Sequence, residues 1–129
     1  MTTVLVIDDE RMIRWSIKQT LCSAGYEVTV AETATTGLAL LRDLHPDVVL
    51  LDVRLPDANG LTVLEQMKRG TEHGSAAVIV MSACDDEGTA AAALQLGACA
   101  FLKKPFDFDM LQGLVQRAAT SPSGAEPSR

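Results

Sequence analysis

The sequence predicts an α/β fold built on a doubly wound, five-stranded parallel sheet. Short runs rich in β-branched residues alternate with segments of helical length, and they lie at residues 4–7, 27–30, 48–51, 78–81 and 101–102. Such runs are typical of buried parallel strands, whose connecting helices cover both faces of the sheet. Several runs lead into a charged or hydroxyl residue. Because functional sites of open parallel sheets gather at the carboxyl ends of the strands, we expect one site there.

The apolar spacing after each strand predicts a helix. The first helix ends at Gly25, three further helices span residues 33–44, 61–68 and 85–96, and a fifth begins near Asp107. Polar turns are expected at 55–60 and 70–75. The residues expected to face inward are Ile13, Ile17, Leu21 and Ala24 in the first helix, Ala34, Leu38, Leu41 and Leu44 in the second, and Met110, Leu111, Leu114, Val115 and Ala118 in the fifth.

Length and composition indicate one folded domain at residues 1–119. The chain has 129 residues, of which 47% are hydrophobic, and a formal net charge of -6. This charge disfavours direct nucleic-acid binding, which needs a basic surface. Three widely spaced cysteines and the lack of a long apolar stretch predict a cytoplasmic protein without a membrane partner. Residues 120–129 are rich in Ser, Pro and Gly and predict a flexible linker or tail.

Three acidic residues are expected to converge at the sheet edge, since Asp8 and Asp9 follow the first strand and Asp52 follows the third. Two carboxylates about 5 Å apart repel by about 3 kcal/mol at an effective dielectric of about 20. A small divalent cation would remove that cost. Magnesium prefers oxygen ligands of this kind together with phosphate oxygens, whereas zinc and copper favour His and Cys. The cluster therefore predicts a Mg²⁺ site.

Other residues that follow strands suit a phosphoryl group. Lys104 offers a positive charge, Ser82 offers a hydroxyl donor, and the amide after Ser82 offers a fixed dipole. Asp52 lies alone at the end of the expected central strand, so it is the best candidate for a nucleophile that forms an aspartyl phosphate. The alternative is that the acidic strand ends are only helix caps and that Ser82 is an ordinary loop residue.

These residues, taken in order, resemble the receiver domain of a bacterial two-component response regulator over residues 3 to about 119. The matching positions are Asp8-Asp9, Asp52, Leu55-Pro56 with Asn59-Gly60, Ser82-Ala83, Gly97-Ala98 and Lys104-Pro105-Phe106. The resemblance implies a flavodoxin-like (CheY-like) fold with the strand order 2-1-3-4-5. It also implies a signalling domain that accepts a phosphoryl group from a sensor histidine kinase and is not an enzyme acting on other substrates.

The resemblance also implies the role of each site residue. Asp52 would be the phosphoacceptor, Asp9 and Asp52 would bind Mg²⁺ directly, and Asp8 would bind it through water. The remaining implied roles are a backbone carbonyl ligand from Arg54, phosphoryl contacts from Ser82, the Ala83 amide and Lys104, a cis bond between Lys104 and Pro105, and a switch aromatic at Phe101. As an alternative, Phe101 is a plain core aromatic.

Two helices offer candidate partner surfaces. Arg11, Trp15, Lys18 and Cys22 share one face of the first helix, which in this family meets the kinase; the alternative is that Trp15 only covers the sheet edge. Between Gly88 and Ala100 no residue is charged. The region from Thr89 to Phe101 therefore indicates a homodimer or output-domain surface, or else a small-residue helix chosen for its propensity.

The output and the competing functions remain open at this level. Arg14-Trp15 and the segment 104–107 resemble receivers of the nitrogen-regulator activator type, whose output is transcriptional. A stand-alone receiver or phosphorelay carrier is the main alternative. An aspartyl-phosphate phosphohydrolase would need an acid two positions after Asp52, where Arg54 stands. A flavin-binding flavodoxin is disfavoured because Asp8 and Asp9 would repel its phosphate.

Overall fold

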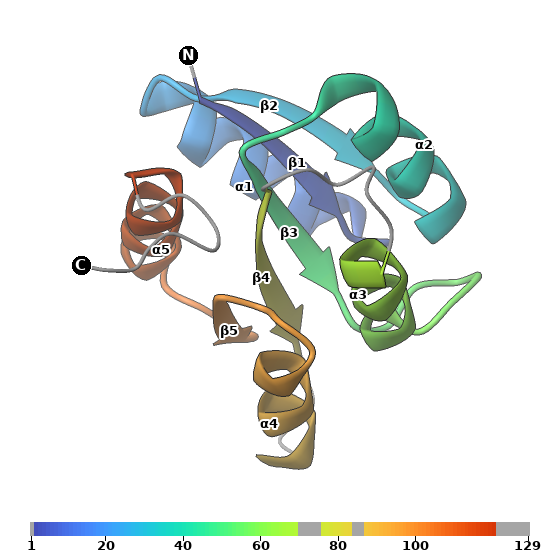
Figure 1. Ribbon diagram of the computed structural model, residues 1–129. Helices are drawn as coiled ribbons and strands as arrows, with labels where there is room; N and C mark the ends of the chain where they lie inside the picture. The colour runs from blue at the N-terminus through green and yellow to red at the C-terminus, as the bar shows by residue number, and fades with distance from the viewer. Residues whose placement is uncertain (1, 70–75, 84–86, 121–129) are drawn as a thin grey trace.

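Five parallel strands form one sheet in the order β2-β1-β3-β4-β5 (Figure 1). The structure is a computed structural model that describes residues 2–69, 76–83 and 87–120. The predicted fold class and strand order are confirmed. The strands are β1 (Thr3–Ile7), β2 (Glu27–Ala31), β3 (Val48–Asp52), β4 (Ala77–Ser82) and β5 (Ala100–Lys103). The helices are α1 (Arg11–Ser23), α2 (Ala34–Leu44), α3 (Gly60–Arg69), α4 (Glu87–Gln95) and α5 (Phe108–Thr120).

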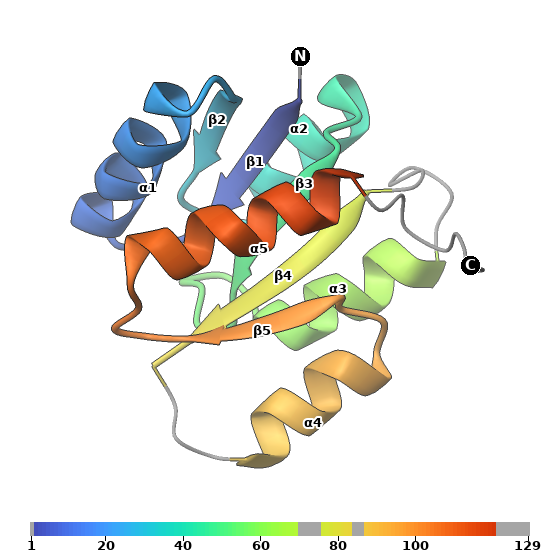
Figure 2. The ribbon, with the colours of Figure 1, turned by 90° about the vertical axis from the view of Figure 1, so that its left-hand side faces the viewer.

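Helices cover both faces of the sheet and create two hydrophobic cores. Alternate residues of a strand point to opposite faces, so Val49 and Leu51 pack against α2, α3 and α4, whereas Val48 and Leu50 pack against α1 and α5. Figure 2 shows α1 and α5 together in front of the sheet. Because both faces are buried, the central strands are continuously apolar, which is the pattern that made them recognisable in the sequence.

The strand register aligns the carboxyl ends of the three central strands. Ile7 pairs with Leu51 and Asp52 pairs with Met81, so Asp8 follows β1 beside the end of β3. Ser82 ends β4 and pairs with Lys103 in β5. The order of the sheet thus brings residues from four distant parts of the chain to one edge, as the sequence predicted.

The helix faces differ from the expectation at three positions. Ala24 lies after the end of α1 and is exposed, Leu44 is 39% exposed at the last residue of α2, and Met110 is 57% exposed. In α5 the buried stripe runs through Leu111, Val115 and Ala118, and Met110 lies one helical step outside it. The inward placement of these three residues was therefore wrong, because helical periodicity does not say how wide a stripe the sheet covers.

Several sequence expectations fall outside the described residues. They are the polar turn at 70–75, the start of the fourth helix at 85–86 and the linker at 121–129; Thr120, expected in the linker, is the last residue of α5. No helix among the described residues is long and apolar enough to cross a membrane.

Gly60 begins α3 directly against the strand that carries Asp52. A Cβ at this position would overlap the backbone carbonyl oxygen of Asp52 and lie 2.7 Å from the Cα of Val53. Neither backbone atom can move without shifting the end of β3. We expect Gly60→Ala to lower the free energy of unfolding by about 2–3 kcal/mol in chemical denaturation.

Gly113 in α5 provides a matched control, because a Cβ there meets no atom within 4 Å. Gly113→Ala should raise stability by about 0.5–1 kcal/mol, since alanine restricts the unfolded chain and favours the helix. If both substitutions changed stability equally, the close approach at Gly60 would not be the cause.

Candidate functional site

Three aspartates meet at the carboxyl edge of the sheet, as expected. Asp8 follows β1 and is completely buried, Asp52 ends β3 and is 4% exposed, and Asp9 is exposed. Each residue offers a carboxylate oxygen that lies within 4.8 Å of the others. The parallel register holds Asp8 and Asp52 close together although 44 positions separate them in the chain, and Asp9 adds an outer ligand position.

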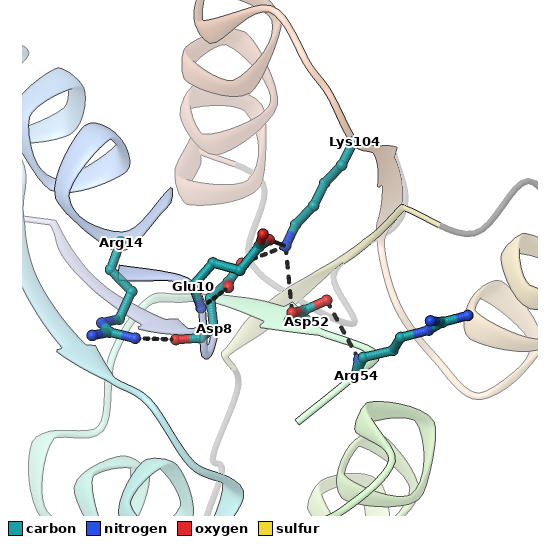
Figure 3. A network of polar contacts seen from close by, with 6 residues as sticks. All are labelled: Asp8, Glu10, Arg14, Asp52, Arg54 and Lys104. Carbon is teal, nitrogen blue, oxygen red and sulfur yellow. Dashed lines mark hydrogen bonds and ion pairs between the residues drawn. The ribbon is translucent and has the colours of Figure 1, made fainter. Parts of the chain in front are cut away.

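The ammonium group of Lys104 lies between the carboxylates (Figure 3). Its Nζ is 2.8 Å from Oδ2 of Asp8, 2.8 Å from Oε1 of Glu10 and 3.3 Å from Oδ2 of Asp52. Lys104 follows β5, and its backbone N–H donates to the carbonyl of Ser82, so the end of the sheet fixes the base of the side chain. The cis bond between Lys104 and Pro105 that the resemblance implied is present.

The surroundings change the acidity of both partners. Burial, and after it the charge of Asp8, raise the pKa of Asp52 to about 6, although Lys104 acts in the opposite direction. Burial alone would lower the pKa of Lys104, but the contacts with Asp8 and Glu10 outweigh it and raise that pKa above its usual value. Lys104 is therefore charged at every ordinary pH, and Asp52 is an unusually basic carboxylate.

Every polar atom of Asp8 except Oδ2 takes part in a hydrogen bond. Its backbone N–H donates to Ala31, its carbonyl accepts from Nη1 of Arg14 at 2.8 Å, and its Oδ1 accepts from the N–H of Glu10 at 2.8 Å. Its buried Oδ2 approaches Lys104 but accepts no hydrogen bond of good geometry from any described residue. A buried oxygen of this kind normally has a further partner, and Asp8, Asp9 and Asp52 each offer a carboxylate oxygen within 4.8 Å of the other two. The three carboxylates thus fit a divalent cation.

An open cavity of about 270 Å³ gives access to Asp52. Its lining residues are Asp9, Glu10, Asp52, Arg54, Ala83 and Lys104. The N–H of Arg54 lies 3.4 Å from Oδ1 of Asp52, which places the Arg54 backbone beside the carboxylate. Ser82 is buried at the end of the neighbouring strand β4. Of the residues predicted for the cation and phosphoryl contacts, five line this cavity, whereas Asp8 and Ser82 lie buried at the adjoining strand ends.

Phe101 lies within strand β5, away from the strand ends that carry the other predicted site residues. It lies in β5, where it pairs with Val80, and its half-buried ring packs against the core on the α4 face. It does not line the cavity. Its position is compatible with a core aromatic and with a switch element, so both interpretations stand.

Two residues of the network were not predicted as site residues. Glu10 binds Lys104 and lines the cavity, and Arg14 binds the carbonyl of Asp8 and lies 3.8 Å from Glu32. Glu10 directly follows Asp8 and Asp9, so a third consecutive acid after the strand was a usable signal. The role of Arg14 had no such signal, because it depends on how α1 packs beside the strand.

A family model described as "Response regulator receiver domain" matches residues 4–116. The chain belongs to the response regulator receiver family. Among curated proteins it is 42% identical over 115 residues to "DNA-binding transcriptional regulator NtrC" of Salmonella typhimurium, and 38% identical over 115 residues to "Regulatory protein AtoC" of Escherichia coli. Each alignment covers 89% of this receiver chain but 24% of the relative. The chain thus spans about a quarter of the length of these relatives.

Solved structures agree with this membership. NtrX from Brucella abortus matches with a TM-score of 0.83 and 34% identity, covering 93% of this receiver and 26% of NtrX. A CheY-like receiver domain protein from Methanospirillum hungatei also has a TM-score of 0.83, with 30% identity over 93% of this chain and 95% of its own. The resemblance to nitrogen-regulator receivers is confirmed at the level of family relatives.

The raised pKa of Asp52 makes its ionisation costly to the folded receiver. The folded state binds this proton more tightly than the unfolded chain, so this carboxyl's contribution to stability falls as pH rises from about 4 to about 6. We expect Asp52→Asn to raise the free energy of unfolding of the metal-free protein at pH 7 by about 1–2 kcal/mol. This is less than the free energy that corresponds to the whole pKa shift, because the carboxylate borders an open cavity where solvent screens its charge.

The measurement is chemical denaturation of both proteins in the presence of a chelator between pH 4 and 7.5. The stability difference between Asp52→Asn and the natural receiver should grow with pH. A difference that stays constant across this range would contradict the raised pKa.

Proposed function

We propose that this receiver is the phosphoacceptor of a two-component system and that Asp52 takes the phosphoryl group. The observation that carries the proposal is the shared position of Lys104, whose Nζ lies near both Asp8 and Asp52 at the mouth of an accessible cavity. A carboxylate beside a fixed positive charge can attack an electrophile whose negative charge that cation then stabilises. Because its pKa is raised, the ionised carboxylate of Asp52 is a stronger nucleophile than that of an ordinary aspartate.

The proposed step is an in-line transfer from the phosphohistidine of a sensor kinase. An Oδ atom of Asp52 forms the new O–P bond, the P–N bond breaks, and the leaving imidazole takes up the electron pair. Lys104 stays protonated and pairs with the phosphoryl oxygens, while Ser82 and the Ala83 amide are the further proposed contacts. The product is an aspartyl phosphate, so the domain acts on itself and needs no catalytic turnover on another substrate.

The acidic pocket of this receiver would hold Mg²⁺ through Asp9 and Asp52, with Asp8 behind them and the backbone carbonyl of Arg54 as an additional ligand. The bound cation would neutralise the carboxylates and the incoming phosphoryl oxygens. The buried Oδ2 of Asp8 and the mutual approach of three carboxylates support this choice. The chemistry of the donor set, which is all oxygen, supports magnesium over zinc.

The α1 surface is the proposed kinase-docking surface. Trp15 is 58% exposed and lines a shallow groove of about 170 Å³ together with Arg11, Arg14, Lys18 and Val30. The large exposure argues against Trp15 as a simple cover of the sheet edge. An exposed indole among cations suits a partner that offers apolar and acidic side chains.

The region from Thr89 to Phe101 is the proposed output surface. Ala93 is buried against the core, whereas Leu94 is 51% exposed, so α4 leaves apolar surface uncovered. This surface would bind a second copy or an output domain that follows a linker at 121–129. The transcriptional regulators among the relatives favour a transcriptional output, and a stand-alone phosphoryl carrier is the alternative. We also propose a cytoplasmic location, where kinase and output would meet.

Incubation with acetyl phosphate and Mg²⁺ should add one acid-stable, base-labile phosphoryl group to the receiver. Mass spectrometry of the intact protein should show one added group, and peptide mapping should place it on Asp52. Asp52→Asn should abolish the modification, and a chelator should reduce its rate at least about 100-fold, because the carboxylates then repel the donor.

Asp47→Asn is the matched control for this experiment. Asp47 precedes β3 at the opposite end of the same strand and accepts the N–H of Thr3 at 2.9 Å, far from the acidic pocket. It should leave phosphorylation unchanged. Full modification of Asp52→Asn with the same lability would rule out the proposed acceptor.

Trp15→Ala should slow phosphoryl transfer from the cognate kinase by about 10-fold or more, because it removes a large exposed contact. Its rate with acetyl phosphate should not change. Leu44→Ala serves as a control, since Leu44 is partly exposed on α2 at the other face of the sheet. Equal losses of Trp15→Ala with both donors would assign Trp15 to the fold instead of docking.

A further inference from the structure

The loop at residues 53–59, between β3 and α3, reaches across to the beginning of α2 through Asp57. Oδ1 of Asp57 accepts the backbone N–H of Ala34 at 2.8 Å. Its Oδ2 accepts the N–H of Thr35 at 3.0 Å and the hydroxyl of Thr35 at 2.8 Å. The carboxylate of one loop therefore caps a helix that lies more than 20 positions earlier in the chain.

The cap of α2 is divided between two residues. The first amides of a helix lack partners within it. Thr33, the residue directly before α2, accepts the N–H of Thr36 through Oγ1 at 3.1 Å. Asp57 accepts the N–H groups of the two preceding residues, Ala34 and Thr35. The bond from Ala34, followed by those from Thr35, holds the pKa of Asp57 down at about 2. The carboxylate is thus ionised at any working pH and suits the positive end of the helix.

The same loop carries the backbone of Arg54, which lines the acidic pocket. The shape of the loop is fixed internally by an antiparallel bridge between Arg54 and Asn59, by the N–H of Leu55 donating to Ala58 at 3.2 Å, and by Gly60 donating to Val53 at 2.6 Å. A loop with a fixed shape moves as a unit. Its placement relative to α2 therefore influences the position of the Arg54 backbone, whose N–H lies 3.4 Å from Oδ1 of Asp52.

We propose that Asp57 is a positioning residue that couples the beginning of α2 to the cation site by anchoring the loop that presents the Arg54 carbonyl. This inference rests on the proposed Mg²⁺ site. Figure 1 shows α2 and α3 on the same face of the sheet, with the ends of β2 and β3 leading toward them. Because coupling between two equilibria is reciprocal, Asp57 should favour Mg²⁺ binding, and bound Mg²⁺ should in turn stabilise the cap of α2.

The test compares Asp57→Ala with Thr33→Ala in Mg²⁺ titrations followed by NMR or calorimetry. Both variants remove a cap of α2, but Asp57→Ala alone releases the loop. Asp57→Ala should raise the Kd for Mg²⁺ by about tenfold, which is the smallest effect expected when a residue that orients a metal ligand is removed. Thr33→Ala should destabilise the protein and leave the Kd within twofold of the natural value.

Hydrogen exchange at the amides of Ala34 and Thr35 measures the reverse effect, that of bound Mg²⁺ on the cap of α2. Saturating Mg²⁺ should slow their exchange in the natural receiver and in Thr33→Ala, by a factor similar to the Kd change, and should have no effect on them in Asp57→Ala. A purely structural cap would not give this pattern, because Mg²⁺ would then leave the exchange of both amides unchanged.

Two further measurements separate positioning from the loss of a charge. Repeating the titrations in about 0.5 M KCl screens the exposed carboxylate, and the tenfold difference between Asp57→Ala and the natural protein should persist. Thr35→Val keeps every charge and removes the hydroxyl bond to Asp57, so it should weaken Mg²⁺ binding in the same direction, by about twofold. It also serves as the test if Asp57→Ala does not fold.

The outcomes distinguish this inference from the function on which it rests. If Mg²⁺ does not bind the natural receiver, both the cation site and the role of Asp57 are refuted. If Mg²⁺ binds but the Kd is the same in Asp57→Ala, or if exchange at Ala34 and Thr35 does not respond to Mg²⁺, the cation site stands and the proposed coupling is wrong.

Discussion

The ion pairs of Lys104 are the interaction on which the site depends. Parallel pairing of β1 with β3 forces the carboxylates of Asp8 and Asp52 together at a place where both residues are buried. Their repulsion would oppose this pairing without a nearby positive charge. Lys104, which directly follows the edge strand β5, supplies that charge. Removing Lys104 would leave the buried carboxylates without a compensating positive charge, which is expensive.

The distances around Lys104 also bear on the proposed reaction at Asp52. Its ammonium lies closer to Asp8 and Glu10 than to Asp52, where the separation is 3.3 Å. Asp52 thus remains incompletely neutralised, and burial with the neighbouring charge of Asp8 raises its pKa. The repulsion among the carboxylates of such an acidic pocket would be relieved by a bound cation. The same shortage of positive charge underlies the proposed need for Mg²⁺.

Strand ends position some residues of the site, and connecting loops position others. Asp52 and Ser82 are placed by strand ends that both cores hold, whereas the Arg54 backbone depends on a loop with its own internal bonds. The capping of α2 by Asp57 links that loop to a neighbouring element. Precise positioning of a site needs support behind the residues that touch the ligand, and here that support comes from a helix terminus.

The sequence by itself determined the strands, their order through a family resemblance, and the meeting of Asp8, Asp9, Asp52, Ser82 and Lys104. Strand ends are marked by local patterns, and parallel topology then requires them to converge. Tertiary structure alone decided that Arg14 holds Asp8, that Asp57 caps α2, and that Leu44 and Met110 face solvent. Those features depend on the angle and distance at which one element packs on another. Hydrophobic periodicity and residue spacing carry no information about either quantity, so a pattern within one segment could not reveal them.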